Sequence, residues 1–329
     1  MSKKGIILSG MRPTGRLHLG HQNVLNNWVE LQDEYQCFFF IANWHALTTG
    51  WEEAKFIRQN TLEMVADWLA SGLDPEKSVI FAQSDVIEHA ELHLIFSMIT
   101  PLSWLERVPT YKDQIQKFGA MGKDINTYGF LGYPLLQAAD ILMYKATAVP
   151  VGEDQFPHVE LTREVARRFN NLFKPVFPEP QAVVHKKIAT LPGVDGAKMS
   201  KSYGNVISIG ADPDEIKKNV NLMVTDPARI RKTDPGHPEV CVVHKFHGVY
   251  NAPQLSELEA QCRAGSIGCV ACKKQLAIAL EQAQGPIRER RNEILSKKGY
   301  LEEILQDGAA RARAVARKTM EEVREAVFG

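Results

Sequence analysis

The sequence predicts an α/β fold: a doubly wound parallel sheet with a helical insertion, followed by an all-α C-terminal region. Short apolar runs alternate with helical patterns up to residue 188, which favours a parallel sheet covered by helices. From about residue 212 onward the pattern is mostly helical. Hydrophobic residues make up 44% of the 329 residues and charged residues 24%, a composition typical of a globular protein with a substantial core.

Each expected strand is an apolar run of strand length, and each expected helix carries apolar residues at helical spacing. Between the third and fourth strands, residues 90–132 are predicted to form a helical insertion. Its part 109–128 is rich in Lys, Gln, Asp and Gly and is expected to be exposed. The expected strands are 5–9, 37–42, 78–82, 147–151 and 182–188, and the main helices 24–34, 51–71, 133–145, 155–173 and 301–328.

Charge and hydropathy exclude several classes of protein. The formal net charge is zero, so no overall positive field marks the chain as a nucleic-acid binder, although a local patch remains compatible with this balance. No apolar run approaches the roughly 18 residues that a membrane span needs. The N-terminus lacks the pattern of a signal peptide. We therefore expect a cytoplasmic protein without a membrane partner.

Two short motifs carry the strongest functional signal. The first motif joins an expected strand to an expected helix, a position where backbone N–H groups and the helix dipole hold phosphate. It reads Arg12-Pro13-Thr14-Gly15-Arg16-Leu17-His18-Leu19-Gly20-His21. The segment Lys198-Met199-Ser200-Lys201-Ser202 is flanked by glycines and suits a mobile loop that carries cations. A surface histidine or a solvated lysine is the commoner explanation of either motif alone.

Together and in this order, the two motifs resemble the signatures of class I aminoacyl-tRNA synthetases. The resemblance implies a Rossmann-type catalytic domain and amino-acid activation by ATP with Mg²⁺, in which the protein positions the reactants and stabilises phosphate charge. It implies catalytic roles for His18, His21, Lys198 and Lys201. The ATP-binding set that it implies is Arg12, Thr14, Gly20, His21, Gly152, Asp154, Lys198, Met199, Ser200, Lys201 and Ser202.

A third segment points to the substrate. Pro134 suits the first turn of a helix, which places Tyr133, Gln137 and Asp140 on one helix face. The plain alternative is the solvent face of an amphipathic helix. The nearby segment 149–155 reads as a strand that ends in Gly and a polar cluster, and ligands bind at such strand ends in doubly wound sheets.

Residues 138–142 and 149–155 together resemble the paired signature of tryptophanyl-tRNA synthetases. The resemblance implies that Asp140 accepts the indole N–H, that Tyr133 and Gln155 hold the amino-acid backbone, and that His45 lines the same pocket, with Gln137 also in the tryptophan site. A buried acceptor left unpaired by phenylalanine would cost several kcal/mol, so no editing domain is expected. The alternative is a tyrosyl-tRNA synthetase-like enzyme. Compared with many bacterial members, Arg12 and the complete His18–His21 motif are departures that indicate a divergent branch.

Four of the five cysteines are clustered in the C-terminal half, with the spacing C-x20-C-x6-C-x2-C. Cys37 lies in an apolar run and is expected in the core. In a cytosolic chain, such clustering favours metal ligation, and four thiolates suit zinc or a 4Fe–4S cluster. Some members of the resembled branch carry a 4Fe–4S cluster on a similar array, which favours iron–sulfur. The ligands would be Cys241, Cys262, Cys269 and Cys272.

The resemblance implies a catalytic domain at 1–205 and a helical anticodon-binding domain at 206–329. It implies an enzyme that joins L-tryptophan to tRNA(Trp), acts as a homodimer and binds tRNA across the two subunits. Two alternatives from other classes stay open at this point. One is a paralogue that adenylates tryptophan without charging tRNA, and the other is a nucleic-acid-binding module with a vestigial catalytic half.

Overall fold

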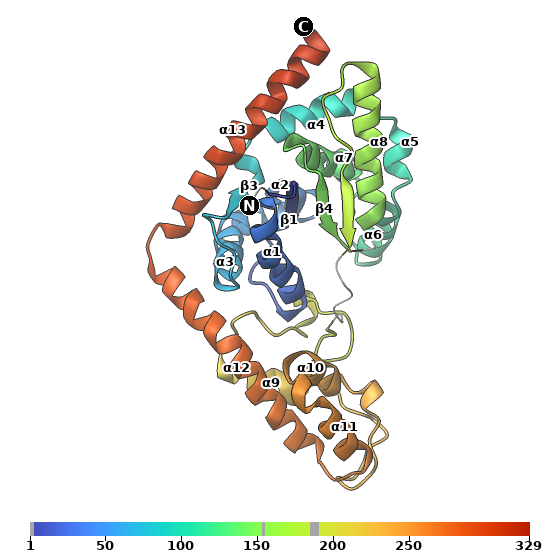
Figure 1. The fold of residues 1–329 in the computed structure, drawn as a ribbon. Coiled ribbons are helices and arrows are strands. Elements are labelled where there is room, and N and C mark those ends of the chain that lie inside the picture. Colours follow the sequence, from blue (N-terminus) through green and yellow to red (C-terminus); the bar gives the residue numbers. More distant parts are fainter. Residues whose placement is uncertain (1–2, 153–154, 185–190) are drawn as a thin grey trace.

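The computed structural model describes residues 3–152, 155–184 and 191–329. Within them, all neighbouring strands are parallel and follow the order β3-β2-β1-β4-β5 (Figure 1). The chain therefore builds the sheet outward from β1 in one direction and then, through β4, in the other. The doubly wound parallel sheet predicted from the sequence is confirmed. The strands are β1 (Ile6–Met11), β2 (Gln36–Ile41), β3 (Ser78–Ala82), β4 (Ala148–Val151) and β5 (Gln181–Val184).

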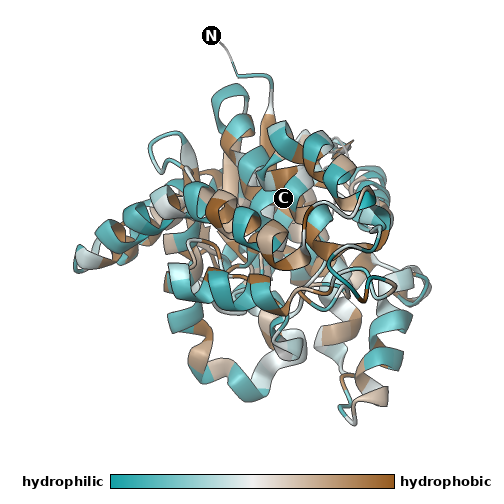
Figure 2. Ribbon diagram, turned by 90° about the horizontal axis from the view of Figure 1, so that it is seen from below, coloured by the Kyte–Doolittle hydropathy of each residue, from teal (hydrophilic) through white to brown (hydrophobic). Residues whose placement is uncertain are grey.

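Helices cover both faces of this sheet, which explains why its strands are mainly apolar. On β2, Phe38 and Phe40 pack toward α4, α7 and α8, while Cys37 and Phe39 pack toward α1 and α3. Figure 2 shows hydrophilic and hydrophobic residues interspersed along the helices of the molecule. The helices around the sheet are α1 (Gln22–Glu34), α2 (Asn43–Gly50), α3 (Ile57–Ala70), α4 (Glu88–Ile99), α5 (Leu102–Glu106), α6 (Pro109–Ala120), α7 (Tyr128–Met143) and α8 (Phe156–Leu172).

A helical lobe follows the sheet and has a core of its own, in which Val220, Phe246 and Leu280 are buried. Its long helix α12 contains Pro286 and reaches back to α3. The last helix, α13, lies against β3, where a side chain at Gly308 would clash with the Ile80 carbonyl oxygen. The last helix of the region 206–329 thus packs on the sheet. The helices are α9 (Pro213–Leu222), α10 (Val242–Tyr250), α11 (Leu255–Arg263), α12 (Cys269–Ser296) and α13 (Tyr300–Phe328).

Two expectations about local structure are wrong. The helix expected at 51–71 is preceded by α2 and interrupted by a 3₁₀ segment, Trp51–Phe56, before α3 begins. α7 begins at Tyr128 because the Thr127 hydroxyl accepts the Phe130 amide at 3.1 Å and caps the helix, so Pro134 lies inside it. The segment 109–128 is largely exposed, as expected, and two residues of its helix α6 also line the cavity described below. No helix in the described residues is long and apolar enough to cross a bilayer.

Candidate active site

A cavity of about 450 Å³ opens where the strand order reverses, beyond the carboxyl ends of β1 and β4. Ligands bind at this position in doubly wound folds because the loops diverge from the sheet there. Of the residues predicted for the site, the cavity wall includes Arg12, His21, His45, Tyr133, Gln137, Asp140, Gly152 and Gln155. Asp154 lies outside the described residues, as does the side chain of Ser202.

The two histidines of the first motif present one N–H donor each. The His18 Nδ1 accepts the Gly20 amide at 3.2 Å, and the His21 Nδ1 accepts the His18 amide at 3.3 Å. A neutral imidazole that accepts through Nδ1 carries its proton on Nε2. Burial, with neighbouring positive charge, lowers the pKa of His18 to about 3 and that of His21 to about 4. Both rings are therefore neutral near pH 7 and carry an Nε2–H donor.

The second motif lies against the first. The Lys201 ammonium donates to the Thr14 carbonyl at 2.8 Å, and burial lowers the pKa of Lys201. Buried Met199 approaches Gly20, where an added Cβ would lie 3.3 Å from the Met199 sulfur. Lys198 is exposed, and its carbonyl accepts from Asn205, which also accepts the Ser200 amide. Two motifs nearly two hundred residues apart thus meet at one place, as expected.

Backbone pairing fixes this meeting. The Leu19 amide donates to the Ile207 carbonyl at 2.9 Å, and the Ile209 amide donates to the Leu17 carbonyl at 3.0 Å. The Leu17 amide donates in turn to the buried Asp67 at 2.6 Å, and Asp67 accepts from Arg291 of α12 at 2.7 Å. The first motif, Arg12–His21 (called the phosphate-side motif below after its expected ligand), is therefore tied to the helical lobe.

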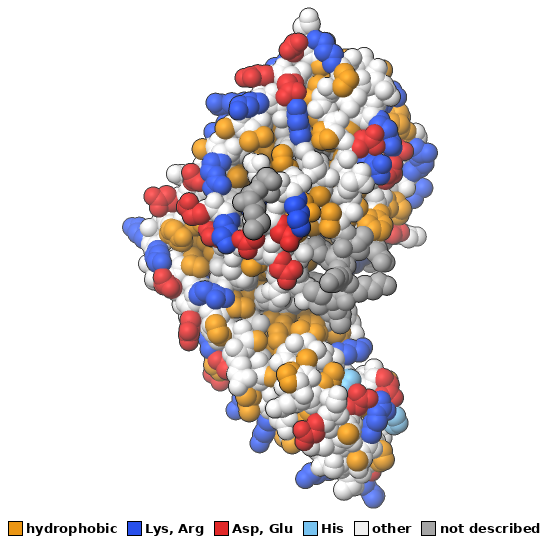
Figure 3. Space-filling model, viewed as in Figure 1, with side chains coloured by type: hydrophobic (Ala, Val, Ile, Leu, Met, Phe, Trp, Pro, Cys, Tyr) orange, Lys and Arg blue, Asp and Glu red, His pale blue; other side chains and the backbone are white. Residues whose placement is uncertain are grey.

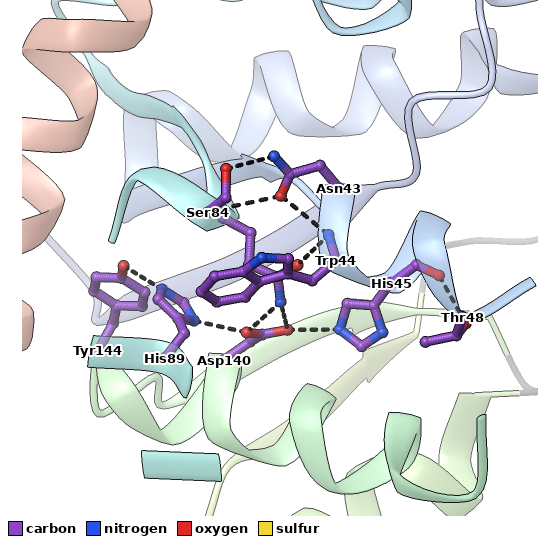
Figure 4. A network of polar contacts seen from close by, with 9 residues as sticks. Asn43, Trp44, His45, Thr48, Ser84, His89, Asp140 and Tyr144 are labelled. Atoms are coloured by element: carbon purple, nitrogen blue, oxygen red, sulfur yellow. Dashed lines mark hydrogen bonds and ion pairs between the residues drawn. The ribbon is translucent and has the colours of Figure 1, made fainter. Parts of the chain in front are cut away.

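At the other end of the cavity, Asp140 is fully buried and accepts from three side chains (Figure 4). Gln83 donates to Oδ1 at 2.7 Å and Oδ2 at 2.9 Å, His89 to Oδ1 at 2.6 Å, and His45 to Oδ2 at 2.8 Å. Burial opposes ionisation, but the hydrogen bonds outweigh it and hold the pKa of Asp140 below its usual value. Asp140 is therefore a carboxylate whose acceptor positions are already filled.

Tyr133 is joined to the insertion. Its hydroxyl lies 2.6 Å from the Thr110 hydroxyl, which lies 2.9 Å from His158 Nε2. Thr110 and Gln114 belong to α6, and both line the cavity. The insertion therefore contributes part of the wall beside the residue expected to hold the amino-acid backbone.

The chain resembles known proteins along almost its whole length. The family described as class I tRNA synthetases for tryptophan and tyrosine matches residues 2–284. The tryptophan–tRNA ligase of Thermotoga maritima is 52% identical over 98% of this chain and 98% of its own length. The tryptophanyl-tRNA synthetase of Campylobacter jejuni, complexed with ADP and tryptophan, has a TM-score of 0.87 at 38% identity, and the match covers 97% of this chain and 98% of that one.

The chain belongs to the class I tryptophanyl-tRNA synthetases. It is a tryptophan–tRNA ligase, which activates L-tryptophan with ATP and transfers it to tRNA(Trp). This conclusion decides against the tyrosine-specific and non-enzymatic alternatives.

The clustered cysteines of this synthetase converge in the helical lobe. Cys241 precedes α10, Cys262 lies in α11, and Cys269 and Cys272 form the start of α12. All are free thiols, and Arg229 approaches Cys262 and Cys269 at 3.8 and 3.9 Å. Burial, reinforced by the other three cysteines, raises the pKa of Cys272 to about 12. Even so, no three His, Cys, Asp or Glu side chains in the described part of the chain are arranged to hold a metal ion.

Sequence reasoning missed three residues around Asp140: Gln83, His89 and Tyr144. Gln83 directly follows β3 and was detectable by the rule that singled out Gly152, since both residues follow the carboxyl end of a strand. Tyr144 lies four residues after Asp140, which places it on the same side of α7. His89 carried no comparable signal, because its role depends on how α4 packs on α7.

Proposed function

We propose that tryptophan binds in the cavity between the two groups of polar residues, with its indole N–H on Asp140. The observation that carries this proposal is the ionised, fully buried Asp140 carboxylate in the cavity wall, among apolar neighbours such as Phe40 and Ile141. An indole combines a large apolar body with a single N–H donor, which matches this end of the cavity. Tyr133, Gln137 and Gln155 then face the ammonium and carboxylate groups of the amino acid.

Binding requires an exchange of hydrogen bonds, because a carboxylate has about four acceptor positions and Asp140 uses all of them. Among the three donors, His45 lines the cavity, whereas Gln83 and His89 are wholly buried behind the carboxylate. The indole N–H therefore replaces His45 on Oδ2. Asp140 is thus not an unpaired acceptor in the empty pocket. Its rejection of phenylalanine depends on the difference in free energy between the state with His45 on Oδ2 and the state with the indole N–H there.

ATP binds at the other end, with Mg²⁺. His18 and His21 donate Nε2–H to the phosphates, and Lys198 and Lys201 stabilise the negative charge as pyrophosphate leaves. Gly20 lets the nucleotide approach the backbone. Arg12, Thr14, Gly152, Asp154, Met199, Ser200 and Ser202 complete the proposed ATP site. In support, the Campylobacter jejuni structure has both ADP and tryptophan bound.

ATP–pyrophosphate exchange tests both ends. Wild-type enzyme should exchange with tryptophan and not with tyrosine. Lys201→Ala should abolish exchange while leaving tryptophan binding intact, and Asp140→Asn should weaken tryptophan binding far more than ATP binding. Thr49→Ser, which keeps the hydroxyl near Arg12, is a matched surface control. Near-normal exchange in Lys201→Ala would contradict the proposed role of the second motif.

We further propose that the four clustered cysteines hold a metal centre, with 4Fe–4S favoured over zinc. Their convergence and their free thiols support this, and the Arg229 guanidinium would stabilise the negative charge of ligating thiolates. Side chains would have to rearrange, since they form no ligand group as they stand. Anaerobic purification should give a brown protein containing iron. A colourless protein with stoichiometric zinc would favour the alternative metal, and a metal-free active enzyme would overturn the proposal.

Finally, we propose a cytoplasmic homodimer that binds tRNA across both subunits, with residues 206–329 providing the anticodon-binding domain. Exposed apolar side chains follow α4 and the start of α5, at Ile87, Leu94, Met98 and Leu102, and a second subunit would cover them. On the face shown in Figure 3, positive and negative side chains are interspersed.

Because the apolar side chains along α4 and α5 would be covered in a dimer, sedimentation should give a dimer at micromolar concentration. Met98→Glu should shift it toward monomer.

A further inference from the structure

Behind the Asp140 carboxylate, a chain of hydrogen bonds continues away from the cavity and ends at Tyr144. The His89 imidazole lies between them, with Nδ1 2.6 Å from Asp140 Oδ1 and Nε2 2.7 Å from the Tyr144 hydroxyl (Figure 4). His89 and Tyr144 are both fully buried. Neither lines the cavity, so neither can touch the substrate directly.

Counting hydrogens assigns each donor. The ionised Asp140 can only accept, so His89 Nδ1 carries a hydrogen. Burial, with the nearby negative charge of Asp140, raises the pKa of Tyr144 well above its ordinary value, so its hydroxyl also keeps its hydrogen. In the described part of the chain, this hydroxyl has His89 Nε2 as its hydrogen-bond partner. The arrangement closes when Tyr144 donates to Nε2 and the neutral His89 donates from Nδ1.

Packing holds both rings in this arrangement. The His89 and Tyr144 ring centres are 5.4 Å apart, Tyr144 stacks on Phe38 at 4.5 Å, and Phe81 lies 6.1 Å from His89. The two residues come from α4 and the end of α7, so the contact also joins those helices. Gln83, the other donor to Oδ1, is fixed separately, because its side-chain oxygen accepts the Trp44 amide at 3.2 Å.

We infer that Tyr144 and His89 are positioning residues for substrate choice: Tyr144 holds the His89 ring through Nε2, and His89 then holds Asp140 as the acceptor for the indole N–H. The inference rests on the proposed function of Asp140. Without the Tyr144 hydroxyl, His89 Nε2 loses its hydrogen-bond partner, and only Asp140 and the neighbouring rings then hold the imidazole. A ring that can turn aligns its Nδ1–H less well with Oδ1, and the carboxylate loses its fixed orientation toward the indole N–H.

The test uses two ligands that differ at one atom: tryptophan, and its analogue in which sulfur replaces the indole N–H (3-benzothienylalanine). Dissociation constants of both are measured by calorimetry for the wild type, Tyr144→Phe, His89→Asn and the double variant. Tyr250→Phe is the matched control, because its buried hydroxyl has no hydrogen-bond partner in the described residues and lies in α10. The melting temperature of each variant reports whether it is folded.

We expect Tyr144→Phe to weaken tryptophan binding about tenfold, as loss of one buried hydrogen bond does, and to leave the sulfur analogue within about twofold. His89→Asn keeps a donor near the position of Nδ1 and should retain most of the preference for tryptophan. In the double variant, Tyr144→Phe should weaken tryptophan binding little beyond the effect of His89→Asn alone. Tyr250→Phe should change neither ligand. Equal weakening of both ligands by Tyr144→Phe, or no weakening of tryptophan, would overturn the inference.

Different results would contradict the proposed function of Asp140 and the role of Tyr144. If the wild type binds tryptophan no better than the sulfur analogue, and Asp140→Asn changes neither, then the proposed function of Asp140 is wrong. If the wild type strongly prefers tryptophan and Tyr144→Phe keeps that preference, Asp140 reads the indole without help from Tyr144.

Discussion

Arg291 should be essential for the stability of the fold, because it neutralises a buried carboxylate that holds the phosphate-side motif. Asp67 is fully buried and accepts from two groups, the Leu17 amide at 2.6 Å and Arg291 at 2.7 Å. Arg291, itself only 7% exposed, also pairs with Glu63. Arg291→Met keeps an unbranched apolar stem and removes the charge.

Breaking a buried pair from one side costs about 3–5 kcal/mol, since the remaining charge is left uncompensated. This is a large share of the roughly 5–15 kcal/mol by which folded domains are stable. Arg291→Met/Asp67→Asn leaves an unsatisfied neutral group instead, at a cost of about 1–3 kcal/mol. The double variant should therefore be more stable than the single one.

Urea unfolding followed by circular dichroism measures both variants. The pH dependence provides an independent check. Burial raises the pKa of Asp67, so the folded state binds its proton more readily than the unfolded state does. Stability from this group consequently rises as pH falls through the interval between its ordinary and raised pKa, and Arg291→Met should extend that interval upward. An Arg291→Met variant within about 1 kcal/mol of wild type would refute the reasoning.

Three further predictions concern the cavity. Burial lowers the pKa of Lys201 from 10.5, and exchange activity needs this cation, so activity should begin to fall below pH 10.5. Lys201→Arg should move the decline to higher pH. An unchanged alkaline profile in the arginine variant would contradict this prediction. His18 and His21 have pKa values lowered to about 3 and about 4, so their contribution to stability is present above their ordinary pKa of 6.5 and is lost as pH falls toward 4. His18→Gln/His21→Gln should flatten the stability profile over that interval in thermal melts, and an equally steep profile would count against neutral rings. Gly10→Ala should raise the KM for tryptophan, because the new Cβ would lie 2.6 Å from the Phe40 ring and push it into the cavity, at a cost of about 1–3 kcal/mol; a KM equal to that of wild type would show that Phe40 moves elsewhere.

Much of the fold was predictable because its strands are buried on both faces and therefore read as unbroken apolar runs. β3 coincides with the expected 78–82, and the other four strands overlap their expected positions. The start of α7 was not predictable from Pro134, because proline suits a first turn but also occurs inside helices whose neighbours hold them in place. Thr127 carried the correct signal.

The candidate site was likewise predictable where its residues form local patterns in the sequence, and less so where they come from several elements. The Arg12–His21 and Lys198–Ser202 motifs are local patterns, and the structure brings them together through the Lys201–Thr14 contact. The surroundings of Asp140 come from β3, α2, α4 and α7, so no local pattern contains them. Composition correctly indicated that 109–128 is exposed, but it did not show that Thr110 also lines the cavity. The roles of the predicted site residues stay predictions until they are measured.

Pro286 interrupts the backbone hydrogen bonding within α12. Because proline has no N–H, the Gln282 carbonyl lacks its usual partner within the helix, and a helix bends most easily at such a point. The bend point separates an arm that begins with Cys269 and Cys272 from an arm that holds Asp67 through Arg291. A break in the hydrogen bonding of α12 therefore lies between the arm that carries these two cysteines and the arm that keeps Leu17 in place.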